Sequence, residues 1–370
     1  MTEEWRALLV SDLHLSNNLP HAKPTEQGRT DRLEDQIRLF DHISKTAKSW
    51  DVDATFILGD LFDKAVVDAV TWTETARCLS QHPAPLFVLG GNHEGVSVHG
   101  ERFTTDALGA IEREGLSVIG DGPVSPVPWL RFWPFPYSSS DTARQGIEDA
   151  SAEIKKDRRT HEVGLLHHSV LGCAHEGWIC NDGLTPEEAC GSFSKCFSGH
   201  FHTPQPFGSV GQYLGSPLQF RFDDEGRKAG FWIARFLRDG SEKLKFISSK
   251  LPKFWRREYG ERLPSRVKPG DYLRITFSGT HAEWLSRRPE LRSYVKTLQN
   301  DGVRATLKHD PTYHHAARIK GSGGSSGLRL EDMMEAYVRS PDVDTEGLDV
   351  DRLVRMGREA LGFARRETES

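Results

Sequence analysis

Short apolar runs of four or five residues, each followed at once by small and polar residues, recur in the first hundred positions of the chain. Such runs are typical of strands buried inside a sheet. Between them, apolar residues recur at three- and four-residue steps, the period of a helix. Strands that alternate with helices predict an α/β layered fold, in which functional groups collect at the carboxyl ends of the strands. The three runs are residues 6–12, 54–60 and 85–93.

Further strand-like runs extend this pattern and predict that residues 1–250 form one domain. They are residues 161–167, 194–199, 212–214 and 230–236. Beyond them the sequence changes character. Residues 251–320 contain two strand-like runs, 272–277 and 303–307, around a helix-like run at 291–298, which predicts a small basic α+β domain.

The last fifty residues are predicted to form a linker and a helical tail. Residues 321–327 consist of glycine and serine, a composition typical of a flexible linker. Residues 328–370 contain two amphipathic helical segments, and the apolar stripe of the first includes Met334 and Tyr337. An apolar stripe of this kind must be buried against another surface. That surface could be the chain's own core, a second copy of the chain in a homodimer, or a partner protein.

Composition places the chain among soluble globular proteins. Of its 370 residues, 37% are hydrophobic and 27% are charged, which excludes a disordered or fibrous protein. No apolar run has the roughly 18 residues of a membrane span, and the first six residues carry two glutamates where a signal peptide needs positive charge. Five cysteines form an odd and sparse set that argues for reduced thiols. We therefore expect a cytoplasmic protein with no membrane contact.

The net charge of -5 conceals an uneven distribution along the chain. Residues 1–250 carry 26 Lys and Arg against 35 Asp and Glu, whereas residues 251–320 carry 15 against 7. An acidic first block is consistent with a carboxylate-rich metal site, although a plain acidic surface would give the same count. The basic block predicts contact with a polyanion, with a merely solvated basic face as the alternative.

The polar residues that follow the predicted strands have the side chains of a metal site. Carboxylates, imidazoles and one amide, without a thiolate, suit a divalent ion such as Mn(II) or Fe(II) better than a structural zinc. Two ions about 3.5–4 Å apart need a bridging carboxylate, and we assign that role to Asp60. In order along the chain, the motifs contain Asp12 and His14; Asp60 and Asp63; Asn92, His93 and Glu94; His167 and His168; and His200 and His202.

Each motif alone occurs by chance, but all five in this order resemble the signature of the calcineurin-like metallophosphoesterases. The resemblance implies an α/β fold, a layered metallophosphoesterase β-sandwich flanked by helices. It implies two divalent metal ions, most simply Mn(II), and a His93 that acts on the phosphate as general acid or stabilises the transition state. Of the two adjacent histidines, we predict that His167 is the ligand. By this resemblance one ion is held by Asp12, His14, Asp60 and His202, and the other by Asp60, Asn92, His167 and His200.

The resemblance narrows to the SbcD-like nuclease subunits of double-strand-break repair at residues 59–63, 215–220 and 226–232. A fourth stretch, residues 198–203, resembles the phage-type recombination endonuclease subunit. The family implies duplex DNA ends as substrate and an SbcC-like ABC-type ATPase as partner of the helical tail. One position departs from the pattern, because these nucleases usually carry Asp where this chain has Glu94. We therefore expect a metal-dependent DNA exo/endonuclease, with a metallophosphoesterase of nucleotides or other small phosphoesters as the alternative.

Two further patterns have simpler explanations. Four of the cysteines and His175 fall between residues 173 and 196, but no C-x-x-C pair is present, so ordinary buried thiols are favoured over a zinc site. The aromatic run at residues 129–137 could stack on bases, yet a core strand with its following turn explains it better. Asp63 is predicted to be a turn or supporting residue rather than a metal ligand.

Overall fold

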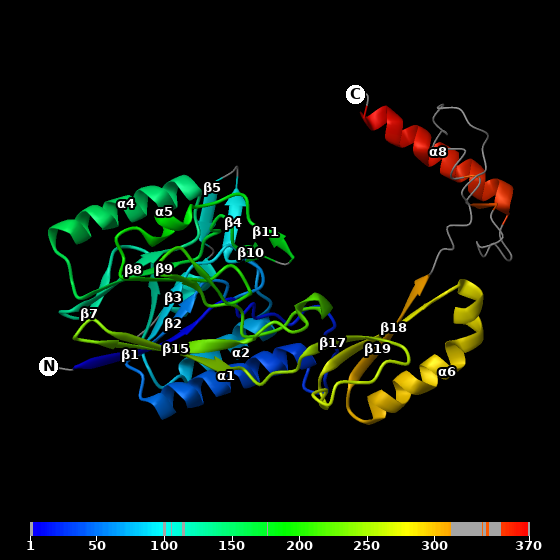
Figure 1. Ribbon diagram of the computed structural model, residues 1–370, viewed down its shortest axis with the longest axis horizontal. Coiled ribbons are helices and arrows are strands. Elements are labelled where there is room, and N and C mark those ends of the chain that lie inside the picture. The colour runs from blue at the N-terminus through cyan, green and yellow to red at the C-terminus, as the bar shows by residue number, and fades with distance from the viewer. Residues whose placement is uncertain are drawn as a thin grey trace. The chain divides into compact units, whose positions relative to one another are not determined.

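The computed structural model describes residues 3–98, 101–104, 106–112, 115–175, 177–311, 335, 338–339 and 349–368. The chain divides into two compact units, Met1–Phe254 and Trp255–Ser370, which are drawn in Figure 1. The predicted linker at residues 321–327 lies outside the described residues, as do Met334, Tyr337 and most of the first tail segment.

The first unit is built on two six-stranded sheets, each with a parallel centre. The first sheet has the order β16-β15-β1-β2-β3-β6, from β1 (Glu4–Val10), β2 (Ala54–Leu58), β3 (Leu86–Leu89), β6 (Leu116–Ile119), β15 (Gly230–Leu237) and β16 (Glu242–Ser248). The second has the order β13-β14-β12-β9-β8-β7, from β7 (Val124–Val127), β8 (Leu130–Phe135), β9 (His161–Leu166), β12 (Lys195–Ser198), β13 (Gln205–Phe207) and β14 (Gly211–Tyr213).

Helices cover the outer faces of both sheets, so the unit has four layers (Figure 1). Side chains alternate along β1: Leu8 and Val10 enter the core under the first helices, whereas Ala7 and Leu9 enter the core between the sheets. This arrangement confirms the predicted layered α/β fold, including the buried strand within the aromatic run. The helices are α1 (Asp31–Trp50), α2 (Ala69–Ser80) and α3 (Asp106–Ile111) on the first sheet, and α4 (Ser140–Lys156) and α5 (Pro186–Cys190) on the second.

Parallel pairing brings the predicted motifs to one edge of the sandwich. In the first sheet β1, β2 and β3 run parallel in neighbouring positions, and in the second β9 and β12 do the same. Because the carboxyl ends of parallel strands share one edge, the loops that carry the five motifs start side by side. Two short hairpins, β4–β5 (Gly95–Val98, Glu101–Thr104) and β10–β11 (Ala174–His175, Trp178–Ile179), and the short 3₁₀ helix η1 (Phe222–Asp224) complete this unit.

The second unit contains a three-stranded sheet in the order β17-β18-β19 and a crossing helix. Helix α6 (His281–Asn300) joins the parallel strands β18 (Tyr272–Gly279) and β19 (Arg304–Pro311), next to β17 (Phe254–Glu258). The helix is longer than the predicted run at 291–298. A capping box between Thr280 and Glu283 starts it, and its first ten residues are mostly exposed, so they show no apolar period. Helix α8 (Val350–Thr368) lies at the end of the described chain.

Among the described helices, none is long and apolar enough to cross a bilayer.

A half-buried histidine connects the first helical layer to its sheet. His82, just beyond α2, contacts Ser44 Oγ of α1 through Nδ1 at 3.0 Å and Thr55 Oγ1 of β2 through Nε2 at 2.9 Å. Burial lowers the pKa of this imidazole to about 4, well below the value of about 6.5 of an unfolded chain. The folded state therefore holds His82 neutral.

Replacing His82 should change how stability depends on pH. Between pH 6.5 and 4 the unfolded chain takes up a proton that the folded chain excludes, so stability is present above about pH 6.5 and is lost as the pH falls. His82→Gln keeps hydrogen-bonding groups but does not titrate. Urea unfolding at pH 7 and pH 5 should show a smaller acid-induced loss for His82→Gln than for the wild type. Equal losses would show that His82 does not cause the acid sensitivity.

Candidate metal centre

Four of the predicted ligands adopt left-handed backbone conformations. The φ angles are 53° at Asp12, 43° at His14, 49° at Asp60 and 85° at His200. Non-glycine residues rarely adopt this region, and each such residue costs about 1–3 kcal/mol that the surrounding structure must supply. Residues held in this way concentrate at functional sites. The loops after β1, β2 and β12 are thus shaped to turn these side chains toward one point.

Glycines allow these loops to approach one another closely. Gly59 has a φ of 84°, and a β-carbon there would collide with the ring of His167. A β-carbon at Gly91 would collide with the backbone and the carboxylate of Asp60. Glycine is therefore required at both positions, because any side chain there would collide with a neighbouring loop.

The carboxylate of Asp60 lies at the centre of the cluster. Its Oδ2 is 3.6 Å from Nε2 of His14 and 3.3 Å from Nε2 of His167, while its Oδ1 accepts the backbone N–H of His93 at 2.9 Å. Asp60 belongs both to a group with His14 and His93 and to a group with His167 and His200, and within each group the ligand atoms lie within 4.8 Å of one another. This is the position that a bridging carboxylate requires.

On one side of Asp60, two histidines and an amide converge. Nδ1 of His167 donates to the carbonyl of Leu58 at 2.7 Å, which leaves Nε2 as the ligand atom. The amide oxygen of Asn92 is 3.1 Å from Nε2 of His167 and 2.8 Å from Nδ1 of His200. The neighbouring His168 points elsewhere, with Nε2 donating to the carbonyl of Pro136 at 2.9 Å. The geometry therefore favours His167 over His168 as the ligand.

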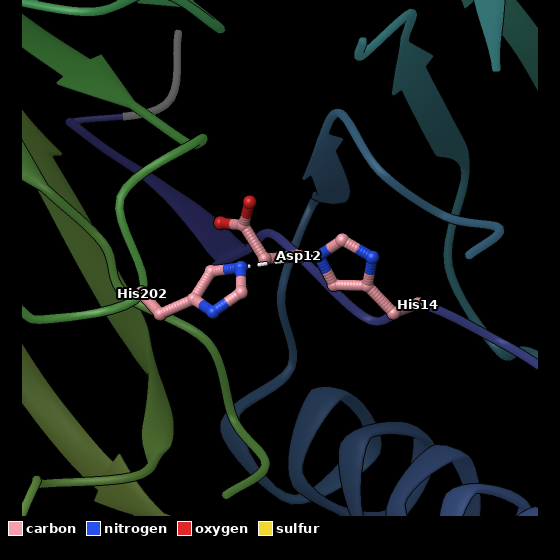
Figure 2. A group of neighbouring side chains, drawn as sticks. All are labelled: Asp12, His14 and His202. Atoms are coloured by element: carbon pink, nitrogen blue, oxygen red, sulfur yellow. Dashed lines mark hydrogen bonds between the residues drawn. The ribbon is translucent and has the colours of Figure 1, made fainter. Parts of the chain in front are cut away.

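On the other side, Asp12, His14 and His202 form a third group (Figure 2). The Nε2 atoms of His14 and His202 are 3.1 Å apart, although two neutral imidazoles gain only a single hydrogen bond from such a contact. Two ligand atoms that are each about 2.1 Å from one ion lie about 3.0–3.4 Å apart, which matches this separation. Asp12 Oδ2 is also buried without a hydrogen-bond partner. These side chains fit a divalent cation.

The charges of the cluster depend on one another. Burial alone would lower the pKa of His167, but the carboxylate of Asp60 outweighs it and raises that pKa to about 9. Burial and then the charge of His167 lower the pKa of His200 to about 2. Burial raises the pKa of Asp12. For Asp60, burial acts in the same direction, but the neighbouring histidines overcome it and lower the pKa. The cluster thus holds an ionised carboxylate in its interior, which requires compensating positive charge.

His93 lies beside the cluster with one ring nitrogen already committed. Its Nδ1 is 2.7 Å from the carbonyl oxygen of Asp63, so Nδ1 carries a proton that it donates to that oxygen, and Nε2 is the ring nitrogen available to a substrate. The ring meets that of His14 edge to face at 4.6 Å. Asp63 also places a carboxylate oxygen 3.6 Å from Nδ1 of His14, a supporting position rather than one inside the three groups.

Glu94 serves as a buried clamp. It is 1% exposed, and its carboxylate accepts the backbone N–H groups of Asp60, Phe62 and Gly91 at 3.2, 2.8 and 2.8 Å. Burial and the nearby charge of Asp60 raise the pKa of Glu94 to about 7. Glu94, which stands where related nucleases usually carry aspartate, therefore holds together two loops that carry predicted ligands. Its role is not a contact with the substrate.

Two supporting residues were not predicted from the sequence as parts of the site. The guanidinium of Arg227 donates to the carbonyls of His202 at 2.7 Å and Ser216 at 3.1 Å, which fixes the loop that carries the predicted ligand His202. The ring of His175 lies 6.3 Å from that of His200 and 6.2 Å from that of His202. Arg227 falls within the stretch 226–232 that carries the resemblance, but nothing in that stretch indicates this role, and His175 belongs to no recognisable short motif. The cysteines are buried free thiols, and among the described residues none joins a metal-ligand group.

Comparisons with known proteins show what this chain is similar to. The family model described as calcineurin-like phosphoesterase matches residues 6–204. The chain is 23% identical over 311 residues to the SbcD component of the nuclease SbcCD of Escherichia coli (strain K12), an alignment that covers 73% of this chain and 72% of that protein. For the protein of the same name from Bacillus subtilis (strain 168), the identity is 22% over 268 residues, with 60% and 63% covered. A dimetal phosphatase from Danio rerio aligns with 66% of this chain and 96% of its own at 11% identity and a TM-score of 0.44.

Replacing Asp60 and replacing Asp12 should have different effects on metal binding. Asp60 touches both sides of the cluster, so Asp60→Ala should abolish tight binding of two ions, whereas Asp12→Ala should remove one ion and weaken the other only modestly. Calorimetric titration with Mn(II) measures the number of ions bound. Retention of two tight sites in Asp60→Ala would contradict the bridging role.

Proposed function

The chain belongs to the calcineurin-like phosphoesterase family, and from this premise we propose that it is a dimetal nuclease that hydrolyses phosphodiester bonds at DNA ends. The observation that carries the proposal is the position of Asp60 between two groups of ligand side chains, which suits a metal pair acting on a phosphoester. We assign one ion to Asp12, His14, Asp60 and His202, and the other to Asp60, Asn92, His167 and His200. Mn(II) suits this set of oxygen and nitrogen donors.

Two divalent ions, when bound, stabilise negative charge on the reacting phosphate and lower the pKa of water. The side chains of the protein have separate tasks. Asp60 holds the two ligand groups together, and Glu94 and Arg227 fix the loops that carry Asp60 and His202. His93 is placed to act on the phosphate: as an imidazolium that donates Nδ1–H to the carbonyl of Asp63, it would deliver its Nε2 proton to the leaving oxygen and become neutral.

DNA as the substrate is supported by the relatives and by charge. The two bacterial relatives are named as nuclease subunits. In the second unit, Arg288, Arg292 and Lys296 lie at four-residue steps along α6 and are exposed, whereas Leu291 and Val295 beside them are buried. Residues four apart share one helix face, so these cations form a stripe that can contact successive phosphates.

The similarity to SbcD-like subunits also suggests a protein partner. We propose that residues 328–370 bind an SbcC-like ABC-type ATPase, because the relatives are named as one subunit of a larger nuclease. Of this segment, α8 is described in the structure, and Met356 on it is 54% exposed. We place the complex in the cytoplasm, in recombination and repair of DNA.

The alternative substrate is a nucleotide or another small phosphoester. The acidic charge of residues 1–250 favours it, since such a surface repels a polyanion. A small substrate would make the cationic stripe of α6 unnecessary, and this difference separates the two functions experimentally.

Replacement of His93 should separate chemistry from metal binding. His93→Ala should leave Mn(II) affinity nearly unchanged and lower turnover by about 10²- to 10⁴-fold, as expected for a lost proton donor. Rates are measured on end-labelled duplex DNA and on bis-p-nitrophenyl phosphate. Parallel losses of metal affinity and rate would make His93 a ligand instead. A wild type that hydrolyses the diester but leaves the duplex intact would support the alternative substrate class.

Removing the positive charges of the cationic stripe on α6 should reduce the dependence of duplex binding on salt concentration. For B-DNA, each neutralised phosphate contributes about -0.9 to the slope of log affinity against log salt, so replacing Arg288, Arg292 and Lys296 with glutamine should make the slope shallower by about 2.7. Fluorescence anisotropy with labelled duplex measures it.

A matched variant tests whether position or total charge matters. Lys155, Lys156 and Arg158 are equally exposed at the end of α4 and just beyond it in the first unit. Their replacement with glutamine removes the same charge and should change the slope much less. Equal changes in the two variants would show that the α6 stripe has no specific role.

A further inference from the structure

The hairpin β10–β11 exposes a tryptophan close to the proposed metal centre. Trp178 is 49% exposed and, among the described residues, is the one aromatic side chain in the set of exposed large hydrophobic residues. About half of the side chain is therefore accessible to another molecule, and an indole can offer its aromatic face for stacking.

Cross-strand pairing directs Trp178 toward the ligand histidines. Trp178 is the strand partner of His175, and the two rings meet edge to face at 5.3 Å. Opposed residues of an antiparallel pair project from the same face of the hairpin. On that face His175 packs on Phe201 at 4.6 Å and, 6.3 Å away, stacks parallel to His200. One imidazole therefore separates Trp178 from a proposed metal ligand.

A cleft adjoins this hairpin and the metal centre. Its lining includes Ala174 and Gly177 of the hairpin segment and His202 of the metal site. The charged residues that line it are Arg221, Asp223, Asp224 and Arg227. Its volume is about 330 Å³, near the lower end of the range for small-ligand sites. The cleft is large enough for a single nucleotide and too small for a duplex.

We propose that Trp178 stacks against an unpaired nucleobase of the nucleotide next to the reacting phosphate. The inference rests on the proposed nuclease function and deepens it, because it specifies a single-stranded or frayed strand at the metal centre. Aromatic faces stack on any base, so the contact gives preference for unpaired nucleotides without sequence specificity. The short path from His200 through His175 to Trp178 allows a base beside the scissile bond to reach the indole.

A double-mutant cycle between the protein and the base tests the contact. The substrate is a short single-stranded oligonucleotide with one phosphodiester bond and methylphosphonate linkages elsewhere, so that the position of cleavage is defined. Versions lacking the base on the 5′ or the 3′ side of that bond are compared with the complete strand. Stacking on an aromatic residue corresponds to about 10-fold or more in affinity.

For the wild type, kcat/KM should fall about 10-fold when one of the two bases is removed. Trp178→Ala should show a similar fall on the complete strand and almost none on further removal of that base. Trp178→Phe should restore most of the sensitivity to the base. Ile179→Ala, which changes the neighbouring residue on the opposite face of the hairpin, should keep the wild-type sensitivity.

Two results would overturn the inference in distinguishable ways. If the wild type cleaves the oligonucleotide and Trp178→Ala loses the same factor with and without the base, the indole has a structural or protein-docking role and the nuclease function stands. If the wild type hydrolyses bis-p-nitrophenyl phosphate but cleaves no oligonucleotide, the nuclease function and the stacking contact both fail.

Discussion

The buried carboxylate of Asp60 is the constraint on which the rest of the site depends. Its side chain is 2% exposed, and an ionised carboxylate at that depth is strongly unfavourable without compensation. Imidazoles of His14 and His167 approach it from two sheets, and the pKa of His167 rises to about 9 as a result. In the absence of metal, the protons on these imidazoles balance the charge of the carboxylate. Divalent ions can replace those protons, so the folded protein contains a buried site that favours cations.

Backbone strain and buried clamps hold this arrangement in place. Asp12, His14, Asp60 and His200 occupy left-handed conformations that other parts of the structure must stabilise. Glu94 supports the loops after β2 and β3 through three backbone N–H groups, and apolar cores on both faces of each strand fix where those loops begin. A rigid sandwich thus places loop residues with the accuracy that catalysis on phosphate needs.

Local patterns predicted much of the fold and the identity of the candidate ligands. Apolar runs of β1, β2 and β3 read directly as buried strands, and Asp12, Asp60 and Asn92 follow them within three residues. The contact of His14 with His202, 188 residues apart, depends on the packing of two sheets and has no local signal. Glu94 and Arg227 were missed as clamps because their partners are backbone groups, which look alike in every sequence. The hairpin around Trp178 is too short for periodicity to reveal it.

Low-temperature electron paramagnetic resonance of the protein with two equivalents of Mn(II) tests the shared carboxylate most directly. Ions about 3.5–4 Å apart and bridged by Asp60 should be magnetically coupled and give a multiline spectrum of a pair. Asp12→Ala, which keeps Asp60 but lowers occupancy of one position, should convert the spectrum to that of a single ion. A wild-type spectrum containing only the six-line signal of isolated Mn(II) at full occupancy would contradict the bridged pair.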